Sequence, residues 1–127
     1  MIRVTQGNDK PTIVAISPIA LNGIQIKEDI GRIVEADLKR SGLFSAIPRR
    51  DMLAFPAFSK DVYYRDWRML GAEYLVVGSM ALIEEDRYRL DFSLLNVTAQ
   101  KTEFNHRVSG TKSQMRDLAH LISDKIY

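Results

Sequence analysis

A change in hydrophobic period near residue 73 constrains the fold of this chain more than any other feature. From there to residue 109, apolar and polar side chains alternate in three runs, separated by polar turns at residues 84–86 and 98–100. A period of two is typical of strands that are buried on one face. The chain is therefore expected to contain three consecutive strands over residues 73–83, 88–94 and 102–109.

The preceding region predicts a buried strand followed by an amphipathic helix. Residues 12–17 form a nearly continuous apolar run, as expected of a strand covered on both faces. Residues 27–41 predict a helix, with Glu28 and Asp29 placed in its first turn, where they suit the helix dipole. Gly42 supplies the left-handed residue that commonly follows a helix. The apolar face of this helix consists of Ile30, Ile33, Val34 and Leu38.

Two further helices are predicted. Residues 60–70 form the shorter one, capped by Ser59, with Tyr63, Trp67 and Leu70 on its buried face. The last helix follows Thr111, whose spacing from Gln114 fits a capping box. Its apolar face consists of Met115, Leu118, Ala119, Ile122 and Ile126.

The order of these elements predicts a mixed α/β fold of the α+β-like kind. A single layer of about four to five strands, including a short edge strand near residues 46–47, packs against two main helices and a shorter one. Residues 2–6 alternate like a strand, but the turn-forming residues 7–11 follow at once. We therefore expect a flexible N-terminal segment, residues 1–10, and a globular domain, residues 11–127.

The sequence offers no candidate catalytic residue, cofactor-binding residue or metal ligand. It contains no cysteine, no phosphate-binding glycine loop and no nucleophile elbow. His106 and His120 stand on different elements and are interpreted as an exposed strand residue and a helix-surface residue. Gly78 lies inside a strand, where close backbone packing explains it better than a ligand does. These observations favour protein binding over catalysis, and a net charge of +2 does not point to nucleic acid.

One patch points toward a different function. Basic and aromatic residues interleave over residues 60–68, as they do in platforms for single-stranded nucleic acid. Because Tyr63 and Trp67 share the face that the helix is expected to bury, core packing is the preferred interpretation. RNA binding stays open as an alternative.

Several stretches of the chain resemble the N-terminal domain of the TolB family. The similar stretches are residues 2–9, 11–18, 28–44, 65–72, 76–78 and 114–124. They cover most of the chain and occur in the family's order. The chain departs from the family at Ile19, where a phenylalanine usually follows the strand proline. It also ends at Tyr127, where the family continues into a β-propeller.

This resemblance implies a periplasmic part of the Tol-Pal system of Gram-negative bacteria, which supports outer-membrane integrity and cell division. Members of the family bind the C-terminal domain of TolA through their N-terminal segment, and Pal through the propeller. By position, the residues implied to bind TolA are Ile2, Arg3, Val4, Thr5, Gln6, Gly7 and Asn8. Nucleic-acid partners, cofactors and membrane insertion are not expected.

The residues themselves favour the same mechanism, because an alternating strand on a flexible joint can add to the edge of a partner's sheet. Alternatively, residues 2–6 pair with this domain's own sheet. Two other functional classes also stay open. The pattern is similar to envelope lipoproteins of the curli-secretion and penicillin-binding-protein-activator type, which are scaffolds or activators. The fold is also similar to the anticodon-binding domains of tRNA synthetases. Finally, Phe55, Phe58 and Tyr127 are candidates for an interface with the propeller.

Overall fold

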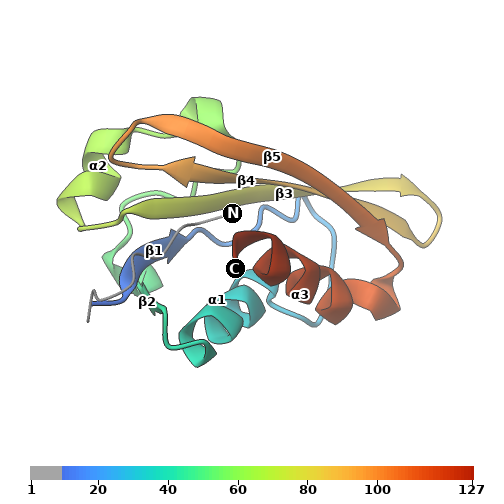
Figure 1. The fold of residues 1–127 in the computed structure, drawn as a ribbon. Coiled ribbons are helices and arrows are strands. Elements are labelled where there is room, and N and C mark those ends of the chain that lie inside the picture. Colours follow the sequence, from blue (N-terminus) through green and yellow to red (C-terminus); the bar gives the residue numbers. More distant parts are fainter. Residues whose placement is uncertain (1–9) are drawn as a thin grey trace.

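The computed structural model describes residues 10–127, which form a five-stranded mixed sheet with helices on both faces (Figure 1). The predicted fold class is confirmed. The elements are β1 (Thr12–Ile16), α1 (Ile30–Arg40), β2 (Phe44–Ala46), α2 (Tyr64–Met69), β3 (Tyr74–Glu84), β4 (Arg87–Asn96), β5 (Lys101–Gly110) and α3 (Met115–Ile126). Short 3₁₀ turns occupy Arg49–Asp51, Ser59–Asp61 and Lys112–Gln114.

The strand order across the sheet is β2-β1-β3-β4-β5. β1 is parallel to both of its neighbours, and its first residues pair with β2 while its last residues pair with β3. β3, β4 and β5 form an antiparallel meander, as the three alternating runs predict. β2 and β5 are therefore the two edges of the described sheet.

The larger hydrophobic core lies between one sheet face and the pair α1 and α3, which cover that face together (Figure 1). The predicted apolar faces of both helices are confirmed, except that Ile33 is only partly buried. From the sheet, this core takes Val14, Ile16, Phe92 and their neighbours at alternating positions. The described helices include none that is long and apolar enough to cross a membrane.

A smaller core lies on the opposite face, around Trp67 of α2. It contains Leu75 and Val77 of β3, with Leu95 and Val97 at the end of β4. This core covers only part of that face, because α2 is short and lies toward one end of the sheet (Figure 1). Polar side chains of β4 and β5 line much of the remainder.

The structure corrects the predicted start of the first helix. Asp29 is not in the first turn but is the N-cap, in extended conformation, and its side chain accepts a hydrogen bond from the Arg32 N–H. Glu28 also precedes the helix. A capping aspartate satisfies a backbone donor that would otherwise lack a partner, which outweighs the dipole preference used for the prediction. Gly42 has a φ of +79°, so the predicted left-handed residue is confirmed.

The second helix is shorter than predicted. Ser59 opens only a 3₁₀ turn, and Val62 is extended and packs against the smaller core. α2 therefore begins at Tyr64, and Tyr63 precedes it in extended conformation. The prediction that Tyr63 is buried is wrong, because its side chain points away from the core and is 77% exposed.

Two local predictions are confirmed at the far end of the chain and in β3. Gln114 Oε1 accepts a hydrogen bond from the Thr111 N–H at 2.9 Å, which is the reciprocal half of a capping box. At Gly78 a Cβ would lie 2.7 Å from Ile19 Cδ1 and 3.0 Å from the Asp91 carbonyl oxygen. Close packing therefore explains this glycine. The short edge strand occupies residues 44–46, slightly earlier than expected.

Candidate functional site

The residues predicted to bind a partner, Ile2, Arg3, Val4, Thr5, Gln6, Gly7 and Asn8, lie outside the described part of the chain. Their role therefore stays a prediction. The structure does show where this segment is attached. Thr12 begins β1, and its N–H donates to the Leu43 carbonyl at 2.9 Å. The next N–H, of Ile13, donates to Glu73 Oε2 at 2.8 Å. The segment is thus followed, after residues 9–11, by an interior strand that is held on both sides.

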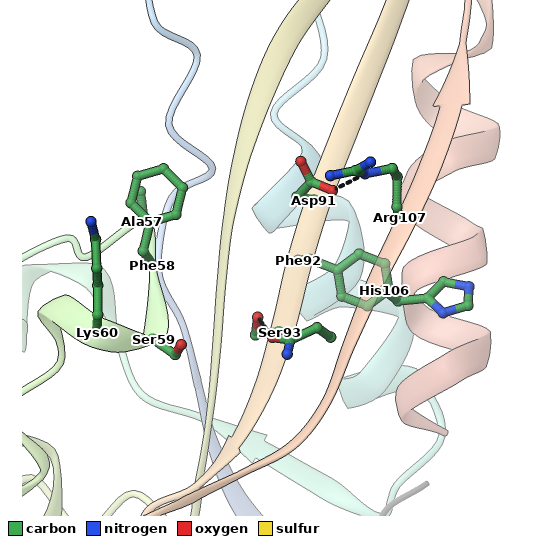
Figure 2. A pocket seen from close by; sticks show the side chains of 10 residues that line it. Ala57, Phe58, Ser59, Lys60, Asp91, Phe92, Ser93, His106 and Arg107 are labelled. Carbon is green, nitrogen blue, oxygen red and sulfur yellow. Dashed lines mark hydrogen bonds and ion pairs between the residues drawn. The ribbon is translucent and has the colours of Figure 1, made fainter.

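An open groove lies on the sheet face that the smaller core leaves uncovered (Figure 2). Its volume is about 550 Å³, and the segment 57–60 forms one wall while β4 and β5 form the other. The residues that line it are Ala57, Phe58, Ser59, Lys60, Asp91, Phe92, Ser93, Asn105, His106 and Arg107. Polar residues outnumber apolar ones in this set, although apolar atoms contribute most of the exposed lining.

Polar side chains of the groove are already paired with one another. Asp91 accepts hydrogen bonds from Arg107 Nε at 2.6 Å and from Arg89 Nε at 3.1 Å. Ser93 donates to the Asn105 side chain, and Lys60 lies over the Phe58 ring. The carboxylate of Asp91 therefore accepts hydrogen bonds from two guanidinium groups, and this arrangement does not favour a role as a base.

A second polar cluster joins α1 to α3. His120 Nδ1 lies 2.6 Å from Asp37 Oδ2, and the Ser123 hydroxyl donates to the same oxygen at 2.7 Å. Arg40 also bonds to the carboxylate. Burial raises the pKa of Asp37, but the hydrogen bonds from Arg40, Ser123 and His120 outweigh this effect and hold its pKa below the ordinary value. The interpretation of His120 as a plain surface residue missed this contact between helices. His106, interpreted as exposed, is partly buried on β5.

The cluster does not have the geometry of a hydrolytic triad. Activation of a serine requires its hydroxyl to bond to the imidazole, which then accepts the proton. Here Ser123 and His120 both bond to Asp37, and the serine also donates to the Ala119 carbonyl at 3.2 Å. The arrangement therefore links two helices. Within residues 10–127, no three histidine or acidic side chains gather closely enough to hold a metal ion.

A further ion pair connects the start of α1 with the loop after β2. Arg49 donates from both terminal nitrogens to Asp29, each at 2.7 Å. The Arg49 side-chain hydrogen bond is the largest cause of the lowered pKa of Asp29, and burial opposes it. Gly31 makes room for this pair, since a Cβ there would lie 2.7 Å from Arg49 Nη2. Both carboxylate oxygens of Asp29 and both terminal nitrogens of Arg49 are used in this contact. The pair therefore holds the loop after β2 against the start of α1.

The basic and aromatic patch does not form a stacking platform. Trp67 is only 3% exposed, so its ring offers no face to a nucleic-acid base, and its predicted place in the core is confirmed. Tyr63 is exposed, yet a platform of successive bases needs several rings in a row. The structure therefore gives the RNA alternative no support.

Exposed apolar side chains gather on the segment before α2 and at the chain end. Phe55 and Phe58 lie in the loop that borders the groove, on the side of the smaller core. Tyr127 follows α3 and lies beside Asp37 and His120, on the helix-covered side. The two phenylalanines therefore lie on one face of the sheet and Tyr127 on the other, so the three residues do not form a single patch. Their role in an interface stays a prediction.

Comparison with known proteins identifies relatives of the whole chain. Residues 1–102 match the family model of the TolB amino-terminal domain. The Tol-Pal system protein TolB of Marinomonas sp. is 44% identical over all of this chain, which spans 30% of that relative's length. The crystal structure of TolB from Acinetobacter baumannii superposes with a TM-score of 0.75 and 28% identity, covering 94% of this chain and 28% of that one.

A second solved structure shares the fold without close sequence similarity. The C-terminal domain of LpoB from Salmonella enterica superposes with a TM-score of 0.64 at 12% identity, over 84% of this chain and 87% of that one. At this identity the likeness shows the fold alone.

Proposed function

Because the chain belongs to the TolB amino-terminal domain family, we propose that it is a non-enzymatic domain of the Tol-Pal system that binds the C-terminal domain of TolA through residues 2–8. The observation that carries this proposal is the family match over residues 1–102, which includes the proposed binding segment. The compartment follows from the system: the domain acts in the periplasm, and its binding supports outer-membrane integrity and cell division.

The proposed mechanism is strand addition. Residues 2–6 alternate between apolar and polar side chains, so one set can enter a partner's surface while the backbone pairs with an exposed sheet edge. Gly7 and the turn-forming residues after it let the strand orient independently of the domain. The attachment at Thr12 supports this model, because the binding segment leads into an interior strand that is paired on both sides.

The side-chain chemistry supports a role in binding. The polar clusters that contain Asp91, Asp37 and Asp29 are satisfied by partners within the domain. Catalysis needs a nucleophile or acid that is positioned beside an available base, and these clusters use their carboxylates to hold elements together.

A wider partnership is proposed for the full-length protein. The chain spans about 30% of the length of the relatives that it matches. We assign Pal binding to the β-propeller that follows this domain in the family, so the domain alone is expected to bind TolA and not Pal.

A calorimetric titration with the TolA C-terminal domain tests the proposal. The full chain is expected to bind, and a variant that lacks residues 2–8 is expected to show no heat of binding. Val4→Pro should also lose affinity, because proline removes a backbone donor from the proposed ladder. Lys39→Ala, on the exposed face of α1, serves as a control that leaves binding unchanged. Equal binding by the full and truncated chains would place the site on the folded body. Failure of both to bind would favour the scaffold alternative.

A further inference from the structure

The segment that follows β1, residues 17–26, runs beside β3 and is called the strap below. The Ala20 N–H donates to the Gly78 carbonyl at 3.0 Å, and the Met80 N–H donates to the Ala20 carbonyl at 2.8 Å. These bonds place Ala20 in a parallel bridge with Ser79. The apolar side chains of the strap pack, partly buried, against the larger core; they are Ile19, Leu21, Ile24 and Ile26. The strap therefore covers part of this core and is joined to the sheet through β3.

Asn22 and Gly23 form the centre of a tight turn within the strap. Their φ angles are +52° and +87°, and the Ile24 N–H donates to the Leu21 carbonyl at 2.9 Å. Two positive φ angles inside such a turn define type I′, in which asparagine followed by glycine is the favoured pair. The sequence contains this pair at one place only.

An asparagine before glycine can also react with its own backbone. The nitrogen of the glycine attacks the side-chain carbonyl carbon, so that a new C–N bond forms while the bond to the amide nitrogen breaks. The proton of the attacking nitrogen leaves with that amide group as ammonia. Water then opens the five-membered imide at one of its two C–N bonds and gives aspartate or isoaspartate. Glycine favours the attack because it has no Cβ to hinder its nitrogen.

The folded chain holds the Asn22 side chain against β3. Its Nδ2 donates to Ser79 Oγ and to the Met80 carbonyl, both at 3.0 Å. A carbonyl oxygen can only accept, so the atom facing Met80 must be the amide nitrogen. The attack requires the side-chain carbonyl carbon of Asn22 to approach the nitrogen of Gly23 in a suitable orientation. Because two hydrogen bonds fix the side chain on β3, the reaction is expected when this contact opens.

We propose that Asn22–Gly23 is a self-modification site that the contact with β3 protects, and at which deamidation makes a transient opening of the strap permanent. The aspartate product has a carboxylate, which offers no donor to the Met80 carbonyl, so the original contact cannot form again. The isoaspartate product adds a carbon to the backbone and disrupts the turn. The inference does not depend on TolA binding, because it uses the strap and β3 and not residues 2–8.

Peptide mapping by mass spectrometry, after incubation of the full chain in mildly alkaline buffer, tests the protection. Deamidation at Asn22 should be at least about tenfold slower in the folded chain than in the same chain in urea. Ser79→Ala removes one acceptor and should speed the reaction of the folded chain about two- to tenfold. It should leave the rate in urea unchanged. Ser45→Ala, on the exposed side of β2, is the matched control and should change neither rate.

Asn22→Asp, which has the side chain of the aspartate product, tests the consequence. Hydrogen exchange at the amides of Ala20 and Met80 should become about tenfold faster, because the strap opens more often. Exchange at Ile122, inside α3, should stay unchanged, which separates opening of the strap from damage to the whole fold. Removal of residues 2–8 should affect neither measurement.

Four results would each overturn the inference. The first is that Asn22 reacts as fast in the folded chain as in urea, and the second is that it does not react in urea. The third is an unchanged rate in folded Ser79→Ala. The fourth is unchanged exchange at Ala20 and Met80 in Asn22→Asp.

Discussion

His120 of α3 and Asp37 of α1, 83 positions apart in the chain, are joined by a 2.6 Å contact between Nδ1 and Oδ2. The Asp37 side chain is only 14% exposed and also accepts the Ser123 hydroxyl. It is thus the polar link between the two helices that cover the larger core. Its lowered pKa means that folding favours the ionised form.

Replacing Asp37 with asparagine should lower the free energy of unfolding at neutral pH by about 1–3 kcal/mol, because three charge-assisted hydrogen bonds are weakened or lost. The folded-state pKa lies below the ordinary value of 3.8, so this stability is present above pH 3.8 and is lost as the pH falls through the folded-state pKa. Urea denaturation at neutral pH and near pH 3 measures both effects. Asp124→Asn, which changes an exposed carboxylate of α3, should have little effect. A destabilisation by Asp37→Asn that does not shrink in acid would contradict the assignment.

Asp29 has two roles that its substitutions separate. Asp29→Ala removes both the N-cap of α1 and the ion pair with Arg49, and should cost about 1–2 kcal/mol. Asp29→Asn keeps a good capping side chain and loses only the charge, so its cost should be smaller. Chemical denaturation of both variants gives the comparison. Equal losses would mean that the cap contributes little.

The corrected position of Tyr63 leads to a matched comparison. Trp67→Ala removes the central side chain of the smaller core and should lower the free energy of unfolding by about 3–5 kcal/mol. Tyr63→Ala removes a ring that is largely in solvent and should change it by less than about 0.5 kcal/mol. Thermal or urea unfolding distinguishes the two. A large effect at Tyr63 would restore the prediction that this residue is buried.

Gly78 should not tolerate alanine. The added methyl would lie 2.7 Å from Ile19 Cδ1 and 3.0 Å from the Asp91 carbonyl oxygen, at a cost of about 1–3 kcal/mol. Ile19→Val removes the nearer of these two atoms, so Gly78→Ala should cost less in that background. A double-mutant cycle followed by denaturation measures this coupling. Additive effects would show that Ile19 moves aside without cost and that the backbone contact dominates.

Periodicity predicted most of the fold. The three alternating runs became β3, β4 and β5, and the apolar stripe from Met115 to Ile126 became the buried face of α3. These predictions hold because side-chain period depends directly on backbone geometry. The boundaries of the elements were predicted less accurately than their type, as the start of the second helix near Tyr63 shows. It has helical spacing from Trp67, but Val62 packs into the smaller core in extended conformation and delays the helix.

Contacts between distant residues could not be predicted in the same way. The pair of Asp37 and His120 depends on how α1 and α3 are placed side by side, and no local pattern in the sequence encodes that placement. The groove likewise needs segment 57–60 to approach β4 and β5. Asp29 was predictable in principle, because aspartate before an apolar helical pattern is a common N-cap. The prediction gave more weight to the dipole than to capping.

The entry of the chain into the sheet at β1 has a mechanical consequence. β1 is parallel to β2 on one side and to β3 on the other, and its first N–H groups are tied to Leu43 and Glu73. A pull on the N-terminal segment along the strand therefore loads the hydrogen bonds to both neighbouring strands together, in shear. An edge strand would instead peel away one bond at a time. A partner that grips residues 2–8 would transmit force to an interior strand of the sheet, and not to one of its edges.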